Sequence, residues 1–313
     1  MNAASSPKSV ARPLGLETAV LLLVSARPRQ WIKNLLVYFP FAFTINLTWY
    51  PSDPSQALAL LGRCTLAFLL LCAVSSAIYL ANDYVDRDQD RAHPRKRHRP
   101  IASGRLQPSV ALAAASVLAS VGVGLSFLLT PVFGGVVALY LALMLVYSLL
   151  LKHVVLIDVL TLGAGFVLRA VAGAVVIAAP VSPWLYVVTA LGALFLGFGK
   201  RRSELTNSSG QAATQRPSLE HYTPALLDQL IGIVAPCALL AYMLYTFTGK
   251  NLPENNAMML TIPFVAYGLF RYLYLIHRTP LGERPEDALL DPPLLITVVL
   301  WLATALAVLF FFR

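Results

Sequence analysis

Nine apolar windows occupy most of this chain, and each is long enough to cross the hydrocarbon core of a lipid bilayer. A membrane-spanning helix needs about 20 consecutive, mostly apolar residues. The windows lie near residues 31–50, 57–81, 108–130, 132–151, 154–179, 183–199, 225–248, 257–277 and 292–312. Hydrophobic residues fill 58% of the 313 positions, more than the core of a soluble domain of this size can enclose. The sequence therefore predicts an all-α, polytopic membrane protein with nine transmembrane helices.

The segment before the first window predicts two further elements. Residues 1–13 are polar and contain proline and serine, so we expect a flexible N-terminal tail. The apolar stretch from Leu14 to Val24 is too short to span a bilayer and lacks a small-residue cleavage site after it. We therefore expect an interfacial helix that leads into the membrane, and not a removed signal peptide. Residues 14–313 are then expected to form a single transmembrane domain.

The distribution of Lys and Arg predicts how the chain is oriented. If the N-terminus is cytoplasmic, 19 of the 24 basic residues fall on the cytoplasmic side, and only Lys250 and Arg313 fall outside. Cytoplasmic loops of membrane proteins carry such an excess. We therefore expect a multi-pass membrane protein with the N-terminus and the charged loops facing the cytoplasm and the C-terminus outside; the motifs and the resemblance described below add an active site on the cytoplasmic side and a bacterial inner membrane to this expectation. The same distribution accounts for the net charge of +9 without a nucleic-acid partner, which we do not expect.

The stretch "NDYVDRDQDRAHPRKRHRPIASG", residues 82–104, concentrates charge directly after the second window. If the helix continues past the membrane, Asn82, Asp86 and Asp90 share one face at intervals of four residues, and Asp83 joins them. Carboxylate and amide oxygens at one level are ligands that Mg2+ prefers. The simpler alternative is a solvated helix end, but acidic residues at a helix C-terminus oppose the helix dipole, so something must offset them. We therefore predict that these four residues bind Mg2+.

The second half of the same stretch is basic. Lys96, Arg97 and Arg99 follow the acidic residues closely. Such a block can simply anchor a loop to anionic lipid head groups. Beside a metal-binding face, however, guanidinium groups are suited to bind phosphate oxygens in pairs. A metal ion together with Arg and Lys is typical of a site for a diphosphate leaving group, on which negative charge develops as a C–O bond breaks.

These motifs carry a family resemblance. "NDYVDRDQD" followed by "HRPIASG" resembles the first aspartate motif of the UbiA superfamily of intramembrane prenyltransferases. The resemblance implies nine transmembrane helices around a central cavity that opens to the cytoplasmic side. Other blocks are similar to the branch of that superfamily that acts on decaprenyl phosphate as a phosphoribosyltransferase. They are "RPRQWIKNLLV" at 27–37, "YSLLLKHVVLIDVLTLGAGFVLRAVAGA" at 147–174, "GKRRSEL" at 199–205, "RPSLEHYT" at 216–223, "RYLYLIHR" at 271–278 and "PEDALLDPPLL" at 285–295.

The resemblance to that branch implies a reaction. A 5-phosphoribosyl group would pass from 5-phosphoribosyl 1-diphosphate to a polyprenyl phosphate such as decaprenyl phosphate, with Mg2+ as cofactor and diphosphate as leaving group. The product would be a lipid-linked phosphoribose for cell-wall glycan (arabinan) synthesis. Prenyltransferases of the superfamily usually carry a second motif of the DxxxD kind, whereas here Asp158 is followed four residues later by Leu162. A single carboxylate at this place is compatible with the phosphoribosyl branch.

The remaining candidate residues come from several helix ends. The predicted catalytic carboxylates are Asp83, Asp86, Asp90 and Asp158. Asp158 and Arg169 fall on one helical stripe, and we expect both to face the cavity, because ionisable residues are costly to bury in a membrane. The predicted substrate-binding residues are Lys33, Asn82, Lys96, Arg97, Arg99, Tyr147, Lys152, Arg169, Lys200, Arg201 and Tyr222. Taken alone, each Lys or Arg at a span end could be only a membrane anchor.

The sequence leaves two other functions open. One is a prenyltransferase that moves a polyprenyl group from its diphosphate to an aromatic or quinone acceptor. The other is a transporter or lipid-binding protein that uses the charged loop only to hold anionic head groups. Glycine and alanine in the fifth and sixth windows either line the path of the polyprenyl tail or allow close helix packing. A homo-oligomer is also left open.

Overall fold

The computed structural model describes residues 15–207, 217–250, 252–279 and 285–312, and in these ranges the chain is helical, with no β-strand. The α-helices are α1 (Gly15–Ala26), α2 (Phe39–Phe43), α3 (Pro54–Val85), α4 (Arg87–Ala92), α5 (Pro108–Leu129), α6 (Pro131–Leu149), α7 (Ile157–Val176), α8 (Pro183–Asn207), α10 (Pro224–Thr248), α11 (Ile262–Arg278) and α12 (Pro292–Phe311). The 3-10 helices are η1 (Pro28–Tyr38), η2 (Lys96–His98), η3 (Leu151–His153), η4 (Pro217–His221), η5 (Ala257–Thr261) and η7 (Pro285–Leu290). The tail predicted at residues 1–13 lies outside the described residues, as do Arg216, Arg284 and Arg313.

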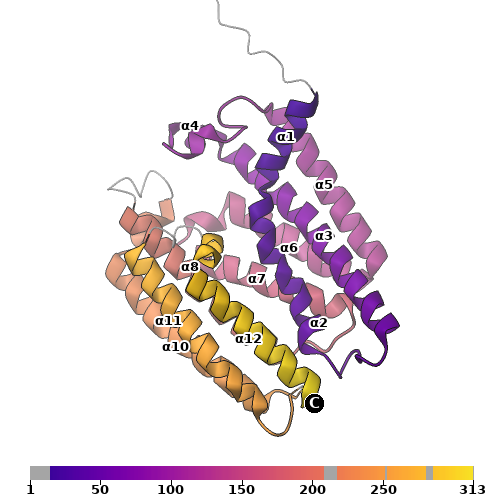
Figure 1. The fold of residues 1–313 in the computed structure, drawn as a ribbon. Helices are drawn as coiled ribbons and strands as arrows, with labels where there is room; N and C mark the ends of the chain where they lie inside the picture. The colour runs from indigo at the N-terminus through magenta and orange to yellow at the C-terminus, as the bar shows by residue number, and fades with distance from the viewer. Residues whose placement is uncertain (1–14, 208–216, 251, 280–284, 313) are drawn as a thin grey trace, which may run out of the picture.

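Among the described residues, eight helices are long and apolar enough to cross a membrane, and they agree with the predicted windows from 57–81 onward. The window predicted at 31–50 is wrong in its bounds. The chain is instead helical from 15 to 43 in three pieces, α1, η1 and α2, and turns back at 44–53. A left-handed backbone at Arg27 (φ 53°) separates α1 from η1. Figure 1 shows the three pieces as one column beside α3. A ninth crossing by this column stays a prediction, as does an interfacial position of α1.

Four long helices begin with the same two-residue signal, an Asp or Thr followed by proline. Asp53, Thr130, Thr223 and Asp291 each accept a hydrogen bond of 3.1 Å from the backbone N–H three residues further on. Proline suits the first helical position, because its φ is already helical and its missing N–H would have no partner there. These pairs fix where α3, α6, α10 and α12 begin.

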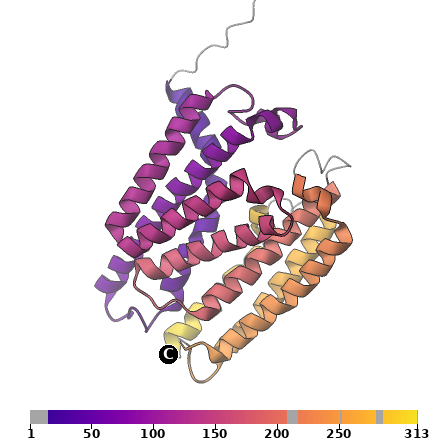
Figure 2. The same cartoon turned by 180° about the vertical axis from the view of Figure 1, so that it is seen from behind.

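The helices form two packed groups that meet at α7. One core cluster joins η1, α3, α6 and α7 around Val37, Leu71 and Phe133. The other joins α7, α8, α10, α11 and α12 around Phe195 and Leu227. Figures 1 and 2 show α4 at one end of the molecule and the C-terminus at the other; α3, α8 and α11 end on the α4 side, where α10 and α12 begin. The most highly charged connections therefore lie at one end.

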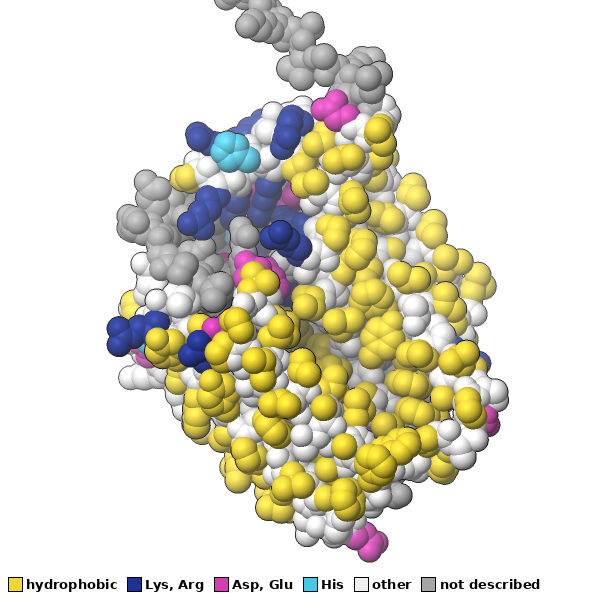
Figure 3. Space-filling model, viewed as in Figure 1, with side chains coloured by type: hydrophobic (Ala, Val, Ile, Leu, Met, Phe, Trp, Pro, Cys, Tyr) yellow, Lys and Arg dark blue, Asp and Glu magenta, His cyan; other side chains and the backbone are white. Residues whose placement is uncertain are grey.

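The outer surface of the molecule is apolar over most of its area. Large side chains such as those of Leu128, Val117 and Phe270 are mostly exposed. Figure 3 shows hydrophobic side chains over most of one face, with Lys and Arg gathered around acidic side chains toward the α4 end. Exposed apolar patches of this extent are not found on soluble monomers, and they suit contact with lipid tails.

α7 packs against η1 through Gly173. A Cβ atom at this position would lie 2.1 Å from the carbonyl oxygen of Val37, so only glycine lets the two backbones approach this closely. Glycines elsewhere in α7 and α8 also face close neighbours, Gly165 toward Met144 and Gly197 toward the side chain of Val159. Close helix packing, one of the two roles predicted for glycines in the fifth and sixth windows, therefore applies at these positions.

We expect Gly173→Ala to lower the free energy of unfolding by about 1–3 kcal/mol, because the backbone of η1 must move to admit the methyl group. The matched control is Gly124→Ala in α5, where a Cβ meets no atom within 4 Å. Relief of backbone entropy should make that variant about 0.5–1 kcal/mol more stable. Thermal unfolding of both purified variants in detergent checks this, and a wild-type midpoint for Gly173→Ala would contradict the packing argument.

Candidate active site

Two buried carboxylates, Asp83 near the end of α3 and Asp90 in α4, share one cation. Arg99 Nη1 lies 3.1 Å from Asp83 Oδ1 and 2.6 Å from Asp90 Oδ2. Arg27, which precedes η1, also forms an ion pair with Asp83. Asp83 and Asp90 are only 2% and 3% exposed, so without these guanidinium groups both charges would lie uncompensated in a poorly solvated place.

Asp86 belongs to a second pair beside the first. The helical backbone continues from α3 toward α4, because the Asp86 amide donates to the Asn82 carbonyl at 2.9 Å and the Asp90 amide donates to that of Asp86 at 2.8 Å. The Asn82 side chain donates to Asp86 Oδ2 at 3.1 Å. Lys152 from η3 forms an ion pair with the other oxygen of Asp86. The predicted shared face is therefore present, and each carboxylate on it contacts a basic side chain.

The donor set fits a hard divalent cation. Asp83 and Asp90 both touch a single nitrogen of Arg99, so their oxygens converge on one positive centre. Within the described ranges, no three His, Cys, Asp or Glu side chains come together in a group that could hold a metal ion. Mg2+ in proteins usually takes one or two carboxylates and completes its shell with water and substrate phosphate oxygens.

The "RPIASG" segment is a folded loop that fixes Arg99. Ile101 and Leu106 are 1% exposed and pack with Leu80 of α3 and Leu21 of α1. Gly104 has φ +76°, a left-handed conformation that side chains rarely adopt, and the Leu106 amide closes the loop on the Pro100 carbonyl at 2.9 Å. The apolar anchors hold the loop, and Arg99 reaches back from it to the acidic pair. Lys96 and Arg97 lie in η2 at the surface side of this loop.

The 3-10 geometry of η1 places one side chain from every turn in a single row. A 3-10 helix has three residues per turn, so side chains at i and i+3 eclipse each other. Gln30, Lys33 and Leu36 follow this spacing within η1, and Arg27 and Phe39 continue it in the sequence on either side. The row changes from polar to apolar between Lys33 and Leu36, and it therefore links the acidic cluster to an apolar region.

Glu286 of η7 meets the middle of this row. It forms an ion pair with Lys33 at 3.5 Å and accepts a hydrogen bond from Gln30, which also accepts one from Lys33. Burial acts to raise the pKa of Glu286, but the positive charge of Lys33, the Gln30 hydrogen bond and the charge of Lys200 outweigh burial and hold that pKa below its ordinary value. Glu286 is therefore an ionised acceptor at neutral pH.

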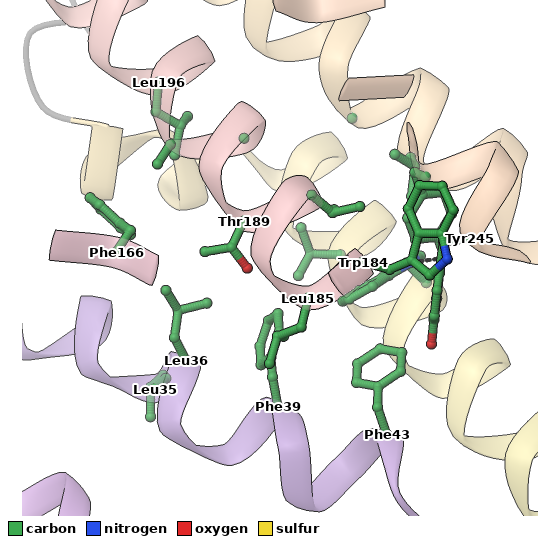
Figure 4. A pocket seen from close by; sticks show the side chains of 18 of the residues that line it. Leu35, Leu36, Phe39, Phe43, Phe166, Trp184, Leu185, Thr189, Leu196 and Tyr245 are labelled. Carbon is green, nitrogen blue, oxygen red and sulfur yellow. Dashed lines mark hydrogen bonds between the residues drawn. The ribbon is translucent and has the colours of Figure 1, made fainter. Parts of the chain in front are cut away.

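An apolar cavity of about 1080 Å³ begins at Lys33 and Glu286. Its walls come from η1, α2, α8, α10, α11 and α12, and its far end lies at Trp184, Tyr245 and Lys250. Figure 4 shows Leu36, Phe39 and Phe43 facing the α8 side chains across the space. Gly192 and Ala193 are small residues of α8 that line it, and a role for them in the path of the polyprenyl tail stays a prediction. A long apolar chain with a polar head at the Lys33 end would suit this cavity.

Asp158 lies in a buried network that ties three segments together. Arg201 Nε donates to Asp158 Oδ2 at 2.7 Å, and Tyr222 donates to Oδ1 at 2.9 Å. The Tyr222 hydroxyl also accepts a 2.7 Å hydrogen bond from the amide of Leu156, which has a strained φ of +67°. Burial, and then the charge of Asp158, raise the pKa of Tyr222. The network joins α7, α8 and the segment after η4, so these residues carry structural connections.

Arg169 lies in a different network from Asp158, although both were predicted to fall on one helical stripe. Its Nε donates to Asn34 Oδ1 at 2.8 Å, its Nη2 donates to Tyr140, and the guanidinium stacks 5.3 Å from the Phe166 ring centroid. On this part of α7, Phe166 lines the apolar cavity. Asp158 and Arg169 therefore belong to two separate networks. Arg169 instead fixes Asn34, the neighbour of Lys33, against α6 and α7.

The structure adds residues that the sequence reasoning did not select. Arg27, Gln30 and Glu286 contact the predicted site residues, although all three lie within blocks that carried the resemblance. Of the other predicted residues, Tyr147 is buried in α6, and Lys200 lies 3.8 Å from Glu204. The three-residue intervals between Arg27, Gln30 and Lys33 place these side chains in one row only if the segment is a 3-10 helix, which the sequence does not indicate.

Several known proteins are similar to this chain in sequence or in fold. The model of the UbiA prenyltransferase family matches residues 37–289. The chain is 36% identical over 302 residues to the decaprenyl-phosphate phosphoribosyltransferase of Mycolicibacterium smegmatis, which covers 93% of this chain and 92% of that protein. It is 34% identical over 285 residues to the protein of the same name from Corynebacterium glutamicum, with 90% and 84% covered. A UbiA homologue from Archaeoglobus fulgidus, solved with GPP and Mg2+, shares the fold at a TM-score of 0.71 and 18% identity, over 92% of this chain and 99% of that one.

Proposed function

The chain belongs to the UbiA prenyltransferase family and is a transferase, and we propose that it moves the 5-phosphoribosyl group of 5-phosphoribosyl 1-diphosphate onto a polyprenyl phosphate. The observation that carries this proposal is the row along η1, which joins a cluster of carboxylates and cations to an apolar cavity. The reaction requires such a junction, because a water-soluble polyanion must meet the phosphate of a lipid. The names of the curated relatives support the same substrates.

Asn82, Asp83, Asp86 and Asp90 are proposed to hold Mg2+. Their oxygen donors suit this ion, and a solved neighbour of the same fold contains it. When bound, the ion would supply positive charge that stabilises the departing diphosphate. Arg27, Arg99 and Lys152 already lie against these carboxylates and would bind further diphosphate oxygens. Lys96 and Arg97, on the same loop as Arg99, would attract the donor from the aqueous side.

Lys33 is proposed to bind the acceptor phosphate, with the polyprenyl tail in the apolar cavity. A lipid phosphate oxygen forms the new bond to the anomeric carbon, and the bond from that carbon to the diphosphate oxygen breaks. The electron pair of that bond leaves with diphosphate. The acceptor is already ionised at neutral pH, so no side chain has to remove a proton. The main task of this site is to hold two anions in line, which the surrounding cations make possible.

The other predicted residues are proposed to position these groups. Asp158, Arg201 and Tyr222 hold the ends of α7 and α8 together beside the site. Arg169 fixes the η1 residue next to Lys33. Lys200 adds positive charge near Glu286, and Tyr147 supports the end of α6 from which Lys152 follows. We also propose that the charged end faces the cytoplasm of a bacterial cell, with the C-terminus outside, and that the product serves cell-wall arabinan synthesis.

A labelled-transfer assay tests the proposal directly. Purified protein in detergent is given decaprenyl phosphate, 5-phosphoribosyl diphosphate labelled in the ribose, and Mg2+. We expect label in the lipid fraction, released diphosphate in equal amount, and loss of both when Mg2+ is removed with a chelator. Absence of transfer, together with consumption of a polyprenyl diphosphate in the presence of an aromatic acceptor, would instead identify a prenyltransferase. Binding without any turnover would indicate a lipid-binding protein.

A further inference from the structure

Tyr272 carries a buried hydroxyl for which the described part of the chain offers no hydrogen-bond partner. The residue is 3% exposed and lines the apolar cavity, close enough to Glu286 to interact with its charge. Its ring lies against the backbone of α8 at Gly199, where a Cβ would be 3.3 Å from the hydroxyl oxygen. A buried donor without a partner costs stability, so a hydroxyl in this position points to a ligand that completes it.

Glu286 also lines this cavity and has unused capacity. It is the sole carboxylate among the described residues that line the cavity, and its side chain is 10% exposed. Lys33 and Gln30 occupy part of it. A carboxylate offers about four lone-pair positions, so it can accept further hydrogen bonds from a ligand. A carboxylate is unsuited to bind phosphate, but it suits hydroxyl groups.

The position of Glu286 beside η1 indicates which part of the donor it would contact. Arg27 contacts the acidic cluster, Lys33 and Glu286 line the apolar cavity, and Gln30, which lies between Arg27 and Lys33 in the row, donates to Glu286. At 2.0 Å per residue, Gln30 and Lys33 are separated by about 6 Å along the 3-10 helix, and Arg27 lies just before its start. The part of the donor that must lie between its diphosphate and the lipid phosphate is the sugar ring.

We infer that Glu286 and Tyr272 recognise the ribose hydroxyls of the donor, with Glu286 accepting hydrogen bonds from them and Tyr272 donating one to a hydroxyl oxygen. This inference rests on the proposed function. These two side chains would make the site selective for a phosphoribosyl donor, because a polyprenyl diphosphate has no hydroxyl group at this place. A site built to bond hydroxyl groups rejects an analogue that lacks them, because its own polar groups are then left unpaired.

The test compares enzyme variants with donor analogues in a double-mutant cycle. Dissociation constants are measured by titration calorimetry in detergent with Mg2+ and without acceptor lipid, for 5-phosphoribosyl diphosphate and for its 2-deoxy and 3-deoxy analogues. We expect Glu286→Gln to weaken binding of the ribose donor by roughly 10- to 100-fold and Tyr272→Phe by roughly 3- to 10-fold. Each loss should shrink to about twofold or less with at least one deoxy analogue, because the group that the side chain contacts is already gone.

Matched controls separate recognition from a structural role. Asp287→Asn alters the neighbour of Glu286, and Tyr274→Phe alters an exposed tyrosine on the same helix as Tyr272; both should bind every donor like the wild type. Tyr272→Phe should also unfold at the same temperature as the wild type or higher, because an unpartnered hydroxyl is removed. Equal losses with the ribose donor and both deoxy analogues would overturn the inference. Failure of the wild type to bind the ribose donor would overturn the proposed function itself.

Discussion

Asp86→Asn should lower the rate of phosphoribosyl transfer by roughly 100- to 1,000-fold while the protein stays folded and inserted. The substitution keeps the size of the side chain and removes one negative charge next to Asn82 and Lys152. The diphosphate site would lose a metal-binding oxygen at the place where charge develops. Asp86 is partly exposed, so loss of its charge should disturb folding less than loss of the buried Asp83.

Asp88→Asn is the matched control for this prediction. Asp88 lies two residues away on the same segment, its side chain is 71% exposed, and its ion pairs with Arg87 and Arg91 are on the surface. Its rate should stay within about twofold of the wild type. Initial rates are measured across a Mg2+ titration, and Asp86→Asn should also need more Mg2+ for half-maximal rate. Equal rates for the two variants would refute the metal assignment.

Asp158→Ala should have the largest effect on stability, about 3–5 kcal/mol. Asp158 is fully buried, and its loss leaves Arg201, 1% exposed, with Glu204 as its remaining acidic partner. The Tyr222 hydroxyl loses its acceptor at the same time. The connection between α7, α8 and the segment after η4 should then loosen, which would be visible as a lower thermal midpoint in detergent.

Asp228→Ala provides a close comparison for that experiment. Asp228 pairs with Arg202, the neighbour of Arg201, but its side chain is 43% exposed. Exposed ion pairs contribute little, so this variant should lose less than about 1 kcal/mol. The double variant Asp158→Ala with Arg201→Met should recover part of the stability lost by Asp158→Ala, because no guanidinium is then left underpaired. Similar midpoints for Asp158→Ala and Asp228→Ala would show that the buried network contributes little.

Sequence patterns were sufficient for the parts of the site that depend on local spacing. The apolar windows predicted the long helices, and the intervals between Asn82, Asp86 and Asp90 predicted their common face. These features follow from helical periodicity, which the order of residues fixes directly. The family was also predicted from such local motifs, and the family match agrees with that prediction.

Long-range pairing could not be read in the same way. Arg27 meets Asp83 across 56 positions, and Gln30 meets Glu286 across 256. Asp158 and Arg169 were predicted to lie together because they fall on one face of a helix. In the structure that face meets two neighbours, since Asp158 contacts Arg201 of α8 and Arg169 contacts Asn34 of η1. The bounds of the first predicted span were wrong because 3-10 geometry depends on packing, at contacts such as that with α7, and has no clear apolar period of its own.

The walls of the apolar cavity come from opposite ends of the chain. Phe39 and Phe43, near the start, lie 6.1 and 5.8 Å from the ring of Trp301 in the last helix. A membrane protein is made from its N-terminus, and early segments enter the bilayer while later ones are still being synthesised. The cavity is therefore incomplete until α12 has joined the bundle. Under the proposed function, lipid binding must therefore wait for α12, and a chain that stops before α12 lacks one wall of the proposed lipid site.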